Sequence, residues 1–121
     1  MKLLVTGREG QLARSLLERA SDYPQIDVTA LGRPELDLEQ PGSARRAIRD
    51  LCPDVVVNAA AYTAVDQAEQ EPDRAFRINA DGAGEVAAAA SKVGAVIIHL
   101  STDYVFNGSA RRPWQPSDAT G

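Results

Sequence analysis

The chain has 121 residues, of which 44% are hydrophobic and 25% are charged, so it suits one packed soluble domain and not a disordered chain. Its formal net charge is −4, which argues against a nucleic-acid-binding surface, because such surfaces need clustered basic residues. No apolar run approaches the roughly 18 residues of a membrane span. The single cysteine, Cys52, excludes an internal disulfide, and no leader sequence precedes the first apolar run. These features predict a cytoplasmic protein.

A glycine-rich turn follows the first apolar run, in the segment TGREGQLA at residues 6–13. Gly7 allows a sharp turn of the backbone, and Gly10 leaves room for a pyrophosphate where a side chain would collide. The helix expected to begin near Gly10 points its unpaired amides at the anion. Ala13 stands where many dinucleotide-binding motifs have a third glycine. An ordinary strand-to-helix turn is the alternative, but the place of the motif before an amphipathic helix favours a dinucleotide site.

Apolar runs alternate with helical patterns along the chain. Strands are expected at residues 3–5, 26–31, 54–57 and 95–100. Helices are expected from about residue 10 to Pro24, and at 43–52, 65–70 and 73–93. Ser43 is expected to cap the second helix, and the chain beyond Ser101 is expected to be loop. With right-handed crossovers, this alternation predicts an α/β fold, a doubly wound parallel sheet (Rossmann fold) with strand order 3-2-1-4.

In such a sheet the ligand lies beyond the carboxyl ends of the strands. After the second strand, Arg33 stands where NAD-preferring sites commonly hold an acid, and a cation there suits a 2′-phosphate. NADPH is therefore the favoured cofactor and NADH the alternative, since an exposed arginine also serves solubility. Asp37 either accepts a hydrogen bond from an adenine amino group or serves as a turn carboxylate. After the third strand, Asn58 and three alanines either admit a nicotinamide ribose or serve tight helix packing.

Four segments together resemble the extended short-chain dehydrogenase/reductases, and within them the dTDP-4-dehydrorhamnose reductase family. They are TGREGQLA at 6–13, LDL at 36–38, NAAAYTAVDQAE at 58–69 and STDYVFNG at 101–108. The likeness runs over essentially the whole chain. It implies NAD(P)H-dependent reduction of the 4-keto group of a dTDP-linked 6-deoxy sugar, with that dTDP-sugar as the substrate.

The resemblance also implies roles for individual residues. Those implied for the cofactor, in addition to Gly7 and Arg33 above, are Gly10, Gln11 and Leu12 at the pyrophosphate, Asp37 and Leu38 at the adenine, Ala61, Tyr62 and Thr63 at the ribose and nicotinamide, and Leu100 beneath the ring. Thr102 matches the catalytic hydroxyl residue that holds the substrate oxygen. Asp103 would hold the sugar, and Asn79 would help to order the backbone of the active site.

The acid–base pair of the family, a tyrosine followed four positions later by a lysine, does not occur in this chain. Tyr23, Tyr62 and Tyr104 are followed at that offset by Asp27, Asp66 and Gly108. Residues 1–121 are therefore expected to be an NAD(P)-binding domain that stops before the catalytic pair and the substrate domain, and to be inactive alone. The alternatives are a non-catalytic dinucleotide-binding subunit, like the regulatory subunit of methionine adenosyltransferase, or another nucleotide-sugar reductase or epimerase.

The remaining candidate residues suggest no metal site. Cys52 has no second cysteine or histidine at ligand spacing, and His99, inside the fourth strand, is expected to be a buried, hydrogen-bonded histidine. The apolar sequence AVIIHL of that strand carries no charge that would discourage pairing with another chain. Self-association through this edge is therefore expected, unless residues 105–121 fold back over it.

Overall fold

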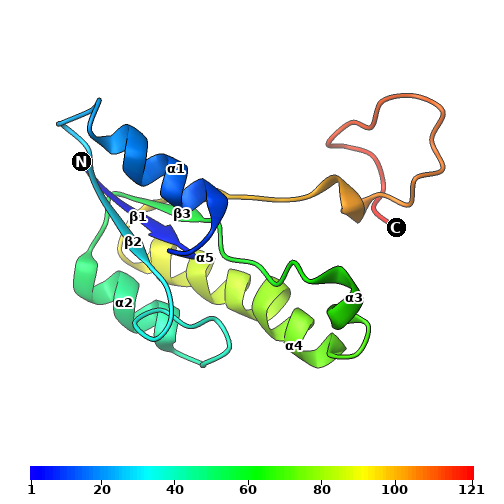
Figure 1. Ribbon diagram of the computed structural model, residues 1–121, viewed down its shortest axis with the longest axis horizontal. Coiled ribbons are helices and arrows are strands. Elements are labelled where there is room, and N and C mark those ends of the chain that lie inside the picture. The colour runs from blue at the N-terminus through cyan, green and yellow to red at the C-terminus, as the bar shows by residue number, and fades with distance from the viewer.

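The computed structural model describes all 121 residues and shows one four-stranded parallel sheet with helices on both faces (Figure 1). The strands are β1 (Lys2–Thr6), β2 (Asp27–Leu31), β3 (Val55–Asn58) and β4 (Val96–His99). The helices are α1 (Gln11–Ala20), α2 (Ser43–Leu51), α3 (Val65–Ala68), α4 (Pro72–Phe76) and α5 (Ala83–Lys92), with a π-helix, η1 (Arg77–Gly82), and a 3-10 turn, η2 (Asp103–Val105). The predicted α/β fold class is confirmed.

The order of the strands is β2-β1-β3-β4, so the expected order 3-2-1-4 is wrong. Strand β3 pairs with β1, not with β2. The helices give the reason, because α1 covers one face of the sheet while α2 and α5 pack together on the other (Figure 1). In right-handed crossovers the covered face is set by the direction of travel across the sheet. Because α2 lies on the face opposite to α1, the chain reverses its direction after β2 and passes β1 to reach β3. Because α5 lies on the same face as α2, the chain then continues in the same direction to β4.

Two apolar clusters hold these layers together. Ile48 of α2 and Val86 of α5 pack with Leu4 and Val56 on one face of the sheet. Ala13 of α1 packs on the opposite face with Val5 and Val57. Neighbouring residues in a strand point to opposite faces, so both must be apolar when both faces are covered. The uninterrupted valine run of β3 follows from this arrangement.

The loop between β2 and α2 is tied down by a serine. Ser43 was expected to cap α2, but the N-cap is Gly42, whose φ of 80° lies in the left-handed region. The Ser43 hydroxyl instead accepts a hydrogen bond of 2.9 Å from the backbone N–H of Asp37. The serine therefore fixes the loop that carries Asp37, a contact between residues six positions apart that helix-capping rules do not describe.

The long helix expected at 73–93 is an unbroken succession of α4, η1 and α5. Its middle turns are π-helix, and there Gly82 lies so close to the loop after β2 that an added Cβ would stand 2.9 Å from the Cβ of Leu38. π-helical turns are frequent at functional sites. The widened segment brings this helix against the loop that holds the candidate adenine residues.

Residues 101–121 leave the sheet and form a tail that stands away from the body of the molecule (Figure 1). The tail closes on itself: the rings of Phe106 and Trp114 stack with centroids 4.7 Å apart, and Arg112 donates hydrogen bonds of 2.7 and 2.8 Å to Asp118. It does not fold back over β4, where Ile98 remains 50% exposed.

Candidate functional site

The carboxyl ends of β1 and β3 meet where the chain reverses its direction across the sheet. Open α/β sheets bind their ligands at such a switch point. Gly7 follows β1 with a φ of +84°, and an added Cβ would stand 3.1 Å from the Cα of Ala60, which follows β3. Both the backbone conformation and the close approach require glycine. Gly10 is the N-cap of α1, so the predicted turn and the predicted start of the helix are both confirmed.

A cavity of about 440 Å³ opens at this switch point, a volume within the range of small-molecule and cofactor sites. The predicted site residues that line it are Gly7, Gly10, Arg33, Asp37, Leu38, Ala61 and Tyr62. Gln11 and Leu12 form the first turn of α1 beside Gly10, and Thr63 follows Tyr62 in the chain. Leu100, Thr102 and Asp103 lie beyond β4 and do not line the cavity.

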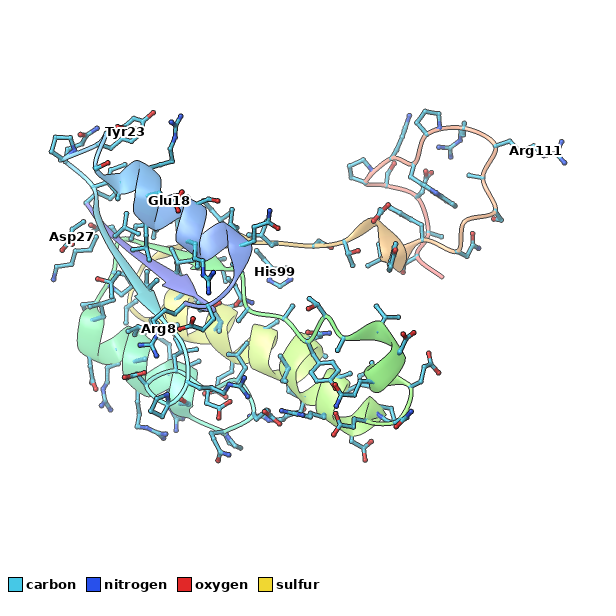
Figure 2. All side chains as sticks on the ribbon, in the orientation of Figure 1. Arg8, Glu18, Tyr23, Asp27, His99 and Arg111 are labelled. Atoms are coloured by element: carbon cyan, nitrogen blue, oxygen red, sulfur yellow. The ribbon has the colours of Figure 1, made fainter.

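Arg8 lines the cavity and was missed by sequence reasoning. Its guanidinium donates a hydrogen bond of 3.0 Å to the backbone oxygen of Arg33 and lies 3.5 Å from a Glu35 carboxylate oxygen. Figure 2 shows Arg8 beside the loop that follows β2. Arg8 and Arg33 thus gather two positive charges at the end of β2. The sequence pattern that indicates a 2′-phosphate site is a cation directly after the second strand, which Arg33 matches and Arg8, inside the glycine turn, does not.

Arg33 is 69% exposed, and its guanidinium lies 3.7 Å from a carboxylate oxygen of Glu39. Each arginine at the end of β2 therefore has a carboxylate neighbour. A phosphate that bound between the two arginines would compete with these carboxylates for charge-assisted hydrogen bonds.

Glu39 also joins a network that forms part of the wall of the cavity. Arg74 of α4 donates hydrogen bonds of 2.7 and 3.0 Å to Glu39 and one of 3.4 Å to Glu71. The hydrogen bond from Arg74 holds the pKa of Glu39 below its usual range. Because these residues lie 35 positions apart, no spacing rule could have paired them.

Tyr62 is held in this wall by its side chain and by its backbone. Its hydroxyl donates a hydrogen bond of 2.6 Å to Glu71, and that carboxylate raises the pKa of the phenol above its ordinary value. Asn79 of η1 accepts the N–H of Tyr62 at 2.8 Å and donates to its carbonyl at 3.0 Å. The phenol proton is thus retained by Glu71, an arrangement that does not suit Tyr62 for giving up a proton near neutral pH.

Asp37 performs the turn role that was one of its two alternatives. One of its carboxylate oxygens accepts the N–H of Glu39 at 2.9 Å, as in an Asx turn. Neighbouring Leu38 is only 6% exposed and belongs to the larger apolar cluster. Contact of either residue with an adenine stays a prediction.

Thr102 and Asp103 lie where the chain has just left the sheet. The pairing of β4 extends one step beyond the strand, because Leu100 N–H donates to the Asn58 carbonyl at 3.1 Å. The Thr102 hydroxyl accepts the N–H of Tyr104 at 3.1 Å and so caps η2. Both Thr102 and Asp103 are exposed, and their catalytic and sugar-binding roles stay predictions.

Two classes of site have no counterpart in the structure. No helix is both long and apolar enough to cross a membrane. No group of three histidine, cysteine, aspartate or glutamate side chains is placed to share a metal ion.

Comparison with known proteins gives a consistent result. The family model described as the RmlD substrate binding domain matches residues 1–121. The dTDP-4-dehydrorhamnose reductase of Sinorhizobium fredii is 47% identical over 121 residues, which is all of this chain and 40% of that protein. The chain thus spans well under half of the length of this relative.

Two solved structures are similar over nearly all of this chain. A dTDP-4-dehydrorhamnose reductase from Clostridium acetobutylicum superposes with a TM-score of 0.93 and 39% identity, covering 100% of this chain and 43% of that one. The reductase from Bacillus anthracis, in complex with NADP, has a TM-score of 0.92 and 34% identity, covering 99% of this chain and 43% of that one. The match extends from the glycine turn to the tail, and the chain therefore belongs to the RmlD substrate-binding-domain family.

Proposed function

We propose that the whole protein reduces dTDP-4-dehydro-L-rhamnose to dTDP-L-rhamnose with NADPH, and that this chain supplies the dinucleotide-binding part. The observation that best supports this proposal is the glycine turn at the switch point, beside a cavity that two arginines, Arg8 and Arg33, help to line. The names of the similar reductases, one of them in complex with NADP, support both the cofactor and the substrate.

The residues of the cavity fit a dinucleotide phosphate. An added Cβ at Gly7 or Gly10 would stand 3.1 Å from a backbone atom, so in this turn both positions offer a ligand only backbone atoms. The first-turn amides of α1 have no partners within the helix and suit a pyrophosphate. Arg33, with Arg8 beside it, would hold the 2′-phosphate. Bound NADPH supplies a hydride to the substrate.

Thr102 would hold the sugar carbonyl oxygen by donating its hydroxyl proton as negative charge develops there. In the structure its oxygen accepts the Tyr104 N–H at 3.1 Å, and its proton is donated to the Asp103 carboxylate over a long 3.5 Å, a contact that the sugar oxygen would replace. Tyr62 cannot take the role of the acid, because it is followed at the required offset by Asp66 and its proton is held by Glu71. The 121-residue chain should therefore bind NADPH without reducing the sugar.

Calorimetric titration of the purified chain with NADPH tests the binding part of this proposal. We expect saturable binding that Gly10→Val abolishes while the far-ultraviolet circular dichroism stays unchanged. NADPH oxidation that depends on dTDP-4-dehydrorhamnose should be absent with this chain and present with the whole protein. A whole protein that binds NADPH but turns over no dTDP-sugar would favour a non-catalytic dinucleotide-binding subunit instead.

A further inference from the structure

We propose that His99 is a positioning residue: it completes a polar ladder, Thr6–Asn58–His99, that fixes two backbone amides on the floor of the dinucleotide cavity. The three residues are register partners at the carboxyl ends of β1, β3 and β4. His99 was expected to be buried, but it is exposed at the edge strand, where β4 gives way to the extended segment (Figure 2). Thr6 and Asn58 are 0% and 1% exposed.

The contacts of Thr6 fix the direction of every hydrogen bond in the ladder. The Thr6 hydroxyl oxygen receives the backbone N–H groups of Ala59 at 3.1 Å and Ala60 at 3.0 Å. A hydroxyl has two lone pairs and one proton. Because both lone pairs are occupied, the proton must be donated, and its acceptor is the side-chain oxygen of Asn58 at 2.7 Å.

The orientation of Asn58 then determines the state of His99. With its oxygen toward Thr6, the amide group of Asn58 points its NH₂ at the Nδ1 atom of His99, 3.1 Å away. Turning the amide over would set the NH₂ against a hydroxyl that has no free lone pair. Nδ1 must therefore be the acceptor in this hydrogen bond, and the tautomer that fits it carries the ring proton on Nε2.

The ladder ends at the cavity. Ala59 and Ala60 line it, and Ala60 makes the close approach to Gly7 that shapes the glycine turn. A loosened Asn58 would release the hydroxyl of Thr6 and with it the two amides. The effect of the ladder on NADPH affinity rests on the function proposed above, whereas the hydrogen bonds of the ladder do not depend on that function.

Two substitutions of His99 separate hydrogen bonding from packing. In His99→Gln the side-chain oxygen still accepts from Asn58, and in His99→Leu no acceptor remains. We expect His99→Leu to weaken NADPH binding by about three- to tenfold, the range that corresponds to the net contribution of one hydrogen bond, and His99→Gln to stay within about twofold of the parent chain. Equal affinity of the parent chain and His99→Leu would overturn the positioning role, as would equal losses in both variants.

A second measurement tests the hydrogen bonds of the ladder in the absence of any cofactor. His99 is the only histidine in the chain, so nuclear magnetic resonance can detect a scalar coupling across the hydrogen bond from Asn58 Nδ2 to His99 Nδ1. We expect this coupling in the parent chain, together with faster hydrogen exchange at the Ala59 and Ala60 amides in His99→Leu than in His99→Gln. Absence of the coupling, or identical exchange in the two variants, contradicts the ladder. Failure of every variant to bind NADPH, with coupling and exchange as expected, contradicts only the proposed function.

Discussion

Arg33 and Arg8 differ in how freely each can turn toward a phosphate. Arg33 is mostly exposed and has one distant carboxylate neighbour, whereas Arg8 is held by the Arg33 carbonyl and by Glu35. We expect Arg33→Ala to lower the ratio of NADP to NAD affinity about tenfold, or about 1.4 kcal/mol, and Arg8→Ala to lower it less. Titration calorimetry with both oxidised dinucleotides measures the ratio.

Arg111 provides the matched control for these two arginines. It lies at the outer end of the tail and has no ion pair or hydrogen bond (Figure 2). Arg111→Ala should leave the ratio unchanged. If the ratio is also unchanged in the double variant of Arg8 and Arg33, neither arginine recognises the 2′-phosphate.

Gly10 is the residue whose replacement should remove dinucleotide binding altogether. An added Cβ would stand 3.1 Å from the Gly7 carbonyl, and the branches of a valine would fill the approach to the first turn of α1. We expect Gly10→Val to abolish affinity for NADPH and NADH alike, measured by quenching of the protein fluorescence or by titration calorimetry. Gly84→Ala, at a site with no atom within 4 Å of the added Cβ, should bind both normally. Retained binding in Gly10→Val would contradict the pyrophosphate site.

At the scale of elements, η1 depends on the absence of a side chain at Gly82. An alanine there would place its Cβ 2.9 Å from the Cβ of Leu38 and 3.2 Å from the Leu38 carbonyl oxygen, so the loop after β2 must move. We expect Gly82→Ala to lower the free energy of unfolding by about 1–3 kcal/mol. Urea denaturation measures it. Gly84→Ala, in the open part of α5, should be neutral or stabilising, since alanine favours the helix. Equal stability of the two variants would contradict the close contact.

The tail is an element whose closure depends on pH. The hydrogen bonds from Arg112 and from the Gln115 N–H lower the pKa of Asp118 below its usual range. Because the pKa of Asp118 is lower in the closed tail, its ionised carboxylate stabilises the closed tail at pH values above the ordinary aspartate pKa of about 4. This stabilisation is lost as the pH falls through the lower pKa of the closed tail.

Trp114 is the only tryptophan, so its fluorescence reports the stacking on Phe106. We expect the signal to be constant from neutral pH to about pH 4 and to change below it, as the Asp118 carboxylate is protonated. Asp118→Asn should show the altered signal already at neutral pH. Glu69→Gln, which removes an exposed carboxylate without an ion pair, should match the parent chain. A parent signal that is independent of pH in this range would contradict the role of Asp118.

At the scale of the whole molecule, β4 is an open edge of the sheet. It pairs only with β3, and Val96 and Ile98 on its α1-facing side are 62% and 50% exposed. Unpaired strand edges with apolar side chains favour pairing with a second chain. We expect the chain to sediment as a dimer or larger species at tens of micromolar, and Ile98→Lys to shift it toward the monomer. Val65→Lys, at a comparably exposed apolar site on α3, should not. A parent chain that sediments as a monomer would rule out this association.

Local patterns in the sequence determined the kinds of element and their order. The apolar face of α2 was predicted from its spacing, and Ala44 and Ile48 are buried as expected. The turn at Gly7 was predicted because glycine alone tolerates the conformation that such a turn needs. Most boundaries differ from the expected ones by one or two residues, the usual uncertainty of helix and strand ends.

The tertiary structure alone decided which distant residues meet. The strand order depends on which face α2 covers, because the handedness of a crossover then fixes the direction of travel, and the amphipathic pattern of α2 is the same for either face. The pairing of Arg74 with Glu39 likewise depends on the packing of α4 against the loop after β2. Periodicity specifies what a segment buries but not against what, so the fold class and the glycine turn were predictable, whereas the wall of the cavity and the ladder to His99 were not.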